Sequence, residues 1–176
     1  MRRGSAGLTL LEVVIALAVF SIAALGLASV IFSTSRLNEG NRERTVVENA
    51  ARSMIEKMRN EEFAEIFRLY NSDPADDPLG PGTGPGANFA VTGLQAIEGD
   101  PDGLPGRIEF PTVVNELRED FDLPELQMPR DLSGDGLVDG NNHAADYRIL
   151  PVTVVVEWRS IGGTTRTTYR TVFVPK

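Results

Sequence analysis

The stretch GSAGLTLLEVVIALAVF, residues 4–20, decides the architecture of this chain. One carboxylate, Glu12, stands near its start, and the apolar run that follows has neither a charge nor a proline over residues 13–32. At about 1.5 Å rise per residue this run makes a helix of about 30 Å, the hydrocarbon thickness of a bilayer. Arg2 and Arg3 lie just before it, and a short basic flank is held on the cytoplasmic side. The pattern predicts a single membrane helix with a cytoplasmic N-terminus and the rest of the chain outside.

Three interpretations of this run compete. A buried core helix would need a large apolar partner surface, which the polar, loop-rich remainder of the chain does not offer. A cleaved secretory signal could use the small residues of GLAS, 26–29, but the apolar run continues past them to Phe32, and Glu12 is out of place in such a signal. The sequence therefore favours a retained helical anchor that is processed at its start.

The residues that carry this interpretation are GLTLLE, 7–12, after a short basic leader. They resemble the N-terminal signature of the type IV pilin and type II secretion pseudopilin superfamily: a glycine, an apolar residue, a threonine, two apolar residues and a glutamate. The resemblance implies that a membrane-embedded prepilin peptidase cuts between Gly7 and Leu8 and N-methylates Leu8. Residues 1–7 would then be a leader peptide, and residues 8–32 the transmembrane helix.

Glu12 gains a role from the same resemblance. A carboxylate in the membrane costs about 2.5–3.5 kcal/mol at the centre and less near an end, so it is normally paired and functional. After the cut, the amine of Leu8 would lie one helical turn away, and a helix N-terminus also favours a negative charge. In pilus-like filaments the resemblance implies pairing with the N-terminal amine of a neighbouring subunit, which would set the register of assembly with other pilin or pseudopilin subunits.

The resemblance extends to a subtype. The segments VVIALAVFSIAALGLA, 13–28, and ENAARSMIEKMR, 48–59, look most like minor subunits of the V-type pilin or I-type pseudopilin kind. Ser29 stands near the place where shaft-forming pilins often carry a proline, and the absence of a proline there favours a minor subunit or a pseudopilin. The implied protein is a non-enzymatic subunit of a type IV pilus or type II secretion filament, held in a bacterial inner membrane with its head on the periplasmic side.

Beyond the anchor, residues 33–70 are expected to continue the helix in amphipathic form, to about Tyr70. Apolar residues recur at three- and four-residue steps on one helical face, then the stripe drifts and resumes. The first set comprises Val47, Ala51, Met54 and Met58, and the second comprises Phe63, Ile66, Phe67 and Tyr70. This half of the helix must pack on a head domain.

The remainder of the chain predicts an antiparallel sheet. Residues 71–106 are rich in proline, glycine and aspartate and are expected to form a surface loop. A first strand is expected over residues 107–114, with Pro111 at an edge or a bend, and a short helical or irregular stretch, NELREDF, follows it.

Two alternating runs, YRILPVTVVVEWRS and TTRTTYRTVFV, predict a C-terminal β-hairpin. A two-residue turn at Gly162 and Gly163 would place Val156 opposite Tyr169, but it would also place Arg159 opposite Arg166, so the register stays open. A lone hairpin is unstable in water and needs the helix stripe as its floor. The expected fold is α+β, a long N-terminal helix packed on an antiparallel sheet head over residues 107–176.

Composition excludes several classes of function. The chain has 176 residues, a net charge of -8 and no cysteine, which excludes thiol catalysis, disulfides and cysteine-based metal sites. The excess of acidic residues argues against nucleic acid as a partner. With a single histidine, His143, the chain is a poor candidate for a Ser-His-Asp apparatus or a multi-histidine metal site, and His143 is interpreted as an ordinary loop residue.

One loop predicts a cation site. In DLSGDGLVDGNNHAAD, residues 131–146, oxygen-bearing side chains fall at positions 1, 3, 5 and 9, a glycine falls at position 6, and a carbonyl is offered at position 7. The loop resembles those of EF-hands and dockerins, except that position 12 is Asn142 and Asp146 would have to close the shell. The candidate ligands of a structural calcium ion are Asp131, Ser133, Asp135, Leu137, Asp139 and Asp146. The alternative is a solvated turn held by local Asx hydrogen bonds.

Two rival functions remain open at this level. One is a calcium-dependent binding or adhesion head displayed on a pilin-type anchor. The other is a membrane-tethered hydrolase that uses aspartate or glutamate pairs, although no paired-carboxylate geometry can be read from the sequence.

Overall fold

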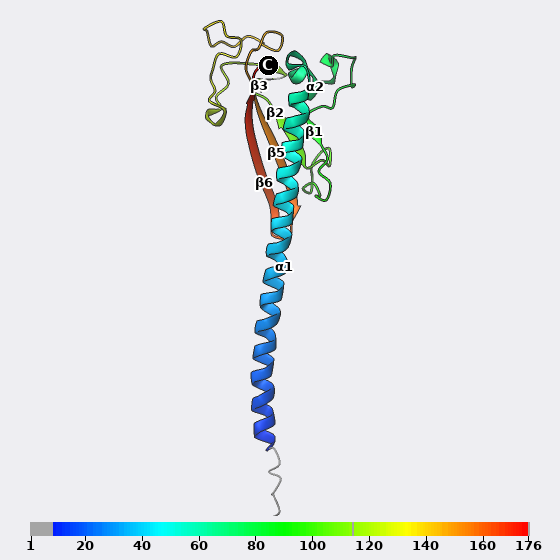
Figure 1. The fold of residues 1–176 in the computed structure, drawn as a ribbon, viewed down its shortest axis with the longest axis vertical. Coiled ribbons are helices and arrows are strands. Elements are labelled where there is room, and N and C mark those ends of the chain that lie inside the picture. The colour runs from blue at the N-terminus through cyan, green and yellow to red at the C-terminus, as the bar shows by residue number, and fades with distance from the viewer. Residues whose placement is uncertain (1–8, 114, 176) are drawn as a thin grey trace, which may run out of the picture. The chain divides into compact units, whose positions relative to one another are not determined.

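The computed structural model describes residues 9–113 and 115–175, and it divides the chain into two compact units, Met1–Arg42 and Glu43–Lys176. Helix α1, Leu10–Asn60, belongs to both units and is drawn in blue to cyan in Figure 1. Among the described residues, α1 is long and apolar enough to cross a membrane, and none of its most apolar window is buried. The expected N-terminal helix is therefore present, with its apolar first half exposed.

Thr9 starts α1. Its hydroxyl oxygen accepts a hydrogen bond from the backbone N–H of Glu12 at 3.3 Å, and its carbonyl accepts from the N–H groups of Glu12 and Val13. A threonine followed three residues later by glutamate is the spacing of a capping box, in which the side chain satisfies an N–H that the helix leaves unpaired. The Thr9 and Glu12 of the motif thus also set the beginning of the helix.

Helix α1 ends at Asn60, ten residues before the end expected near Tyr70. The backbone is extended at Glu62, and a 3₁₀ turn (Phe63–Glu65) and helix α2 (Ile66–Tyr70) follow. The physical reason is periodicity: nine residues are two and a half turns, so an unbroken helix would carry Phe67 on the side opposite Met58. The break allows both side chains, each 0% exposed, to enter one core. The drift of the apolar stripe after Met58 was the sign of this break in the sequence.

The head contains a four-stranded antiparallel sheet of order β1-β2-β5-β6. Its strands are β1 (Asn88–Phe89), β2 (Gly106–Glu109), β5 (Leu150–Ser160) and β6 (Gly163–Phe173). The second half of α1 packs on it, which confirms the expected α+β, pilin-like fold. Strand β1 and a 3₁₀ turn (Pro74–Asp76) lie within the segment that was expected to be loop throughout.

The strand expected over residues 107–114 is two strands in two sheets. Strand β2 ends at Glu109, and β3 (Thr112–Val113) pairs instead with β4 (Glu116–Leu117), which lies in the NELREDF stretch. Pro111 separates them, since proline has no N–H to donate to a ladder. A third 3₁₀ turn, Pro124–Leu126, follows.

The hairpin of β5 and β6 is confirmed, but its register differs by two residues from the one the glycine pair indicated. Ser160 pairs with Gly163, so the turn is Ile161 and Gly162, and Arg166 lies opposite Glu157. The observed register removes the like-charge pair and places opposite charges across the strands, which is stabilising. Gly163 has a φ of +117°, a conformation that glycine adopts readily.

The core of the head lies between the helix stripe and the sheet. The four stripe residues of α1 are buried, as the sequence predicts, together with residues 150–156 and Trp158 of β5. A second, smaller cluster of Val47, Val91, Val156 and Trp158 fills the end of the sheet nearest the start of the head. The carboxylate of Glu43 accepts hydrogen bonds from Trp158 Nε1 at 3.0 Å and from Ser160 Oγ at 2.6 Å, which ties α1 to the end of β5.

Candidate functional site

The loop over residues 131–146 leads into β5, and its first acidic residue is held by its own backbone. The carboxylate of Asp131 accepts hydrogen bonds from the N–H groups of Gly134 and Gly136 and from the hydroxyl of Ser133. The Gly136 N–H is the main cause that lowers the pKa of Asp131. Asp135 accepts from the N–H of Leu137 at 2.8 Å. Gly136 has a φ of +89°, the sharp turn expected at position 6.

Glu119, which follows β4, is the buried acid of this region and was not singled out from the sequence. Its side chain is fully buried, and Oε1 accepts hydrogen bonds from the N–H groups of Leu132 at 2.7 Å and Ser133 at 2.9 Å. Oε2 faces the other way, with the N–H of Asp139 at 3.4 Å. No local pattern marks this glutamate, because its partners lie 13 to 20 residues further along the chain.

Further hydrogen bonds join the loop, and Arg130 just before it, to β4 and the residues that follow β4. The N–H of His143 donates to the carbonyl of Leu117 at 2.8 Å, and the N–H of Leu117 donates to the side-chain oxygen of Asn142 at 3.1 Å. The N–H of Arg130 donates to the carbonyl of Glu119 at 3.1 Å. The side chain of Asn142, at the closing position of the calcium-like pattern, is therefore hydrogen-bonded to the backbone of β4.

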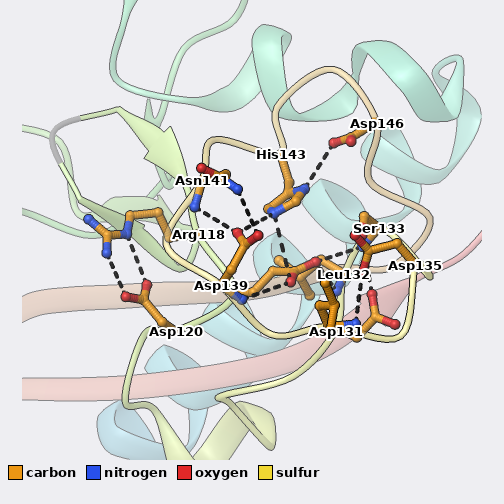
Figure 2. A network of polar contacts seen from close by, with 12 residues as sticks. Arg118, Asp120, Asp131, Leu132, Ser133, Asp135, Asp139, Asn141, His143 and Asp146 are labelled. Atoms are coloured by element: carbon orange, nitrogen blue, oxygen red, sulfur yellow. Dashed lines mark hydrogen bonds and ion pairs between the residues drawn. The ribbon is translucent and has the colours of Figure 1, made fainter.

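The single histidine lies at the centre of this cluster (Figure 2). His143 is 6% exposed, so the interpretation as an ordinary loop residue is wrong. Its Nε2 lies 3.2 Å from Asp139 Oδ1 and 3.7 Å from Glu119 Oε2, and its Nδ1 lies 3.1 Å from Asp146 Oδ1. Three carboxylates surround one imidazole.

The electrostatics of the cluster follow from this arrangement. Burial by itself lowers the pKa of His143, but the hydrogen bonds to Asp139 and Asp146 and the nearby Glu119 outweigh it, so the pKa is raised overall. The N–H of Asn141 and the His143 ring together lower the pKa of Asp139. The ligand atoms of Glu119, Asp139 and His143 all lie within 4.8 Å of one another, so this group could hold a metal ion.

The predicted ligands are thus divided between two environments. Asp131 and Asp135 accept N–H groups of their own loop, Asp139 belongs to the group around His143, and Asp146 contacts the far side of the same ring. Calcium binding by this loop stays a prediction. The signal that could have found His143 was its place between two aspartates at spacings of four and three residues.

The second candidate site is the N-terminal motif. Gly7 and Leu8, the predicted processing residues, lie outside the described residues. Glu12 lies in the first turn of α1 and is exposed, as are the apolar side chains around it.

Comparison with known proteins bears on this end of the chain. A family model described as "Prokaryotic N-terminal methylation motif" matches residues 2–28. The chain carries an N-terminal methylation motif of the pilin and pseudopilin type. The match includes Gly7, Leu8, Glu12 and most of the apolar run. No curated protein and no solved structure matches the chain.

Proposed function

We propose that this pilin-like protein is a minor pilin or pseudopilin, a structural subunit of a type IV pilus or a type II secretion filament. Prepilin peptidase cuts it after Gly7 and methylates Leu8, and the N-terminal helix then carries it into the filament. The observation that carries the proposal is the methylation motif at the head of α1, a helix of 51 residues with an exposed apolar first half.

The exposed apolar side chains support an anchoring and assembling role. Leu10 is 84% exposed, Phe20 70% and Phe32 69%, and the large apolar residues between them are exposed on all sides of the helix. A surface of this kind requires an apolar environment. A bilayer supplies it before assembly, and the N-terminal helices of neighbouring subunits supply it afterwards.

Glu12 is the one charge within that surface, and we assign to it the pairing with the N-terminal amine of a neighbouring subunit. An unpaired carboxylate in an apolar environment is costly, whereas a paired one is not, so correct neighbours are distinguished from incorrect ones. The amine exists only after cleavage. Processing would therefore precede assembly.

The finer assignment follows the same residues. We propose a minor V-type pilin or I-type pseudopilin in a bacterial inner membrane, with its N-terminus in the cytoplasm and its head on the periplasmic side. The basic residues Arg2 and Arg3 support this orientation, since basic flanks are retained in the cytoplasm. A structural role requires no catalytic residue.

Processing is tested by expressing the full chain with and without a prepilin peptidase and weighing its N-terminal peptide. We expect a methylated Leu8 at the N-terminus, which disappears in Gly7→Val. Gly4→Val, a change of another leader glycine, is the matched control and should be processed normally. A soluble mature chain beginning at Ser29 would overturn the proposal in favour of a secretory signal.

Assembly is tested separately through Glu12. Glu12→Ala should be cleaved and methylated like the wild type but should be lost from sheared filaments when the chain is expressed with its assembly machinery. Glu39→Ala, which removes a partly exposed carboxylate of α1 beyond the apolar run, is the control and should assemble. Normal assembly of Glu12→Ala would refute the pairing role while leaving the processing result standing.

A further inference from the structure

We propose that Glu119, Asp139 and His143 bind a divalent transition-metal ion of the zinc class, with Asp146 orienting the imidazole from outside the coordination shell. This site lies in the head and does not depend on the N-terminal motif. Either proposal can therefore fail without the other.

The position of the imidazole is the first argument. A neutral imidazole carries one N–H, and when Nδ1–H donates to Asp146, Nε2 presents a lone pair towards Asp139 Oδ1 and Glu119 Oε2. The lone pairs of Nε2 and of these two oxygens then face one another. Asp139 Oδ1 lies 3.2 Å from Nε2, and Glu119 Oε2 lies 3.7 Å from it. A proton on Nε2 can form a hydrogen bond with one of the two oxygens, whereas a metal ion placed between the three atoms can be coordinated by all of them. Metal-binding histidines almost always donate their other N–H to a carboxylate or carbonyl in this way.

The position of Glu119 is the second argument. The side chain is fully buried, and two strong hydrogen bonds from backbone N–H groups hold Oε1 in place. Oε2 is left facing His143, with a long contact of 3.4 Å from the N–H of Asp139. A buried carboxylate is normally paired or bound to a metal, because its charge is costly to bury alone. Glu119 is thus fixed on one oxygen and available on the other.

The distances fit a small ion. Zinc binds histidine nitrogen and carboxylate oxygen at about 2.1 Å, so two ligand atoms of a tetrahedral site lie about 3.4 Å apart. The two observed separations from Nε2, 3.2 and 3.7 Å, bracket that value. A calcium ion instead takes six to eight oxygen ligands at longer distances, and an imidazole suits zinc, copper, iron or nickel. Three protein ligands leave the fourth position to water.

The chemical consequence is a cross-link within the head. Asp139 and His143, in the loop that leads into β5, lie 20 and 24 residues after Glu119, which follows β4. Binding would fasten the loop of residues 131–146 to the β3-β4 ribbon. Because a metal that binds the folded chain alone stabilises it, the midpoint of thermal unfolding should rise with the ion concentration.

The single histidine makes the test direct. The full chain, labelled with ¹⁵N in histidine and purified in detergent micelles after chelator treatment, is titrated with zinc chloride near pH 7.5. Because the chain has one histidine, one set of imidazole signals is expected. The Nε2 resonance should shift at one equivalent of zinc, while Nδ1 keeps its proton. An unchanged Nε2 resonance at excess zinc would overturn the proposal without any substitution.

Variants then locate the ion. Glu119→Gln and His143→Gln should lose zinc affinity by at least about 100-fold, and Asp146→Asn by about 10- to 100-fold, the range typical of residues that orient a ligand. Asp135→Asn, in the same loop but outside the group, is the matched control and should bind like the wild type. Circular dichroism confirms that each variant is folded. Equal loss in Asp135→Asn and Glu119→Gln, wild-type affinity in Glu119→Gln, or binding of calcium with no binding of zinc would each overturn the proposal.

Discussion

The two halves of α1 differ in the exposure of their apolar residues. In the first half, apolar side chains surround the helix and are exposed, as Phe20 is at 70%. In the second half, they form one stripe, and Met58 is 0% exposed beneath the sheet. A helix that is apolar all round requires a bilayer or other helices, whereas a single stripe requires only a sheet. The stability of the head should therefore depend on the second half of α1 alone.

The largest effect is expected from a pair of core and surface changes along this helix. Met58→Ala should lower the free energy of unfolding of the head by about 2–5 kcal/mol, because it removes a fully buried side chain and leaves a cavity. Phe20→Ala should change it by less than about 0.5 kcal/mol. Thermal unfolding of the full chain in detergent micelles, followed by the near-ultraviolet signal of Trp158, measures both. A comparable loss in Phe20→Ala would show that the first half contributes to the head.

A second prediction concerns the break between α1 and α2. Tyr147 donates a hydrogen bond to the carbonyl of Phe63 at 2.6 Å and accepts one from the N–H of Phe67 at 3.3 Å, which holds the chain where the long helix ends. Burial raises the pKa of Tyr147 from 10.0 to about 12. The folded state favours the neutral phenol of Tyr147. The contribution of this preference to the stability of the head is therefore complete below pH 10 and is lost as the pH rises from 10 to 12. The head should lose about 3 kcal/mol of stability over that interval.

Denaturant titrations at a series of alkaline pH values measure this loss. Tyr147→Phe should flatten the decline, although Tyr70 and Tyr169, whose pKa values burial also raises, will retain part of it. An unchanged slope in Tyr147→Phe would contradict the assignment.

The start of the head provides a smaller effect. Glu43→Ala should cost about 1–3 kcal/mol, because it leaves the buried Trp158 Nε1 without its acceptor. The control, Glu48→Ala, removes an exposed ion pair with Arg52 on the same helix and should cost less than about 1 kcal/mol. Urea unfolding of the two variants gives the comparison. Equal losses would mean that the contact of Glu43 with β5 contributes no more than a surface ion pair.

The smallest effect belongs to the first turn of α1. Thr9→Ala removes the cap on the N–H of Glu12 and should destabilise the helix start by about 1 kcal/mol. Faster amide exchange at Glu12 and Val13, with no change in the unfolding midpoint of the head, is the expected result. A lower midpoint would show that the two halves of α1 are energetically coupled.

Much of the fold follows from local pattern. The run over residues 13–32 indicates the exposed half of α1, the steps from Val47 to Met58 indicate the buried stripe, and the alternation around Val154 indicates β5. Each of these signals lies within one element and repeats with its period. The end of α1 was not predicted from local pattern, because the apolar residues of 63–70 also recur at helical spacing. Only their offset around the helix relative to Met58 indicates the break.

The candidate site was predictable only in part. The pattern over residues 131–146 includes Asp139 and His143, two of the three residues in the group that could hold a metal. His143 was discounted because one histidine has no partner of its own kind in the sequence. Glu119 was not singled out, because no local pattern marks it. Glu119 belongs to the site through contacts with residues 13 to 20 positions further along the chain, whereas His143 contacts Asp139 and Asp146 within its own loop and Glu119 outside it.

By itself the sequence determined the methylation motif, the exposed apolar half of α1 and the α+β character of the head, since each depends on neighbours within a few residues along the chain. The tertiary structure decided the break after Asn60, the pairing of Arg166 with Glu157, and the approach of Glu119 to Asp139 and His143. These features depend on which segments meet in space. The packing of the sheet against the helix stripe determines which segments come into contact, and no periodic pattern in the sequence predicts those contacts.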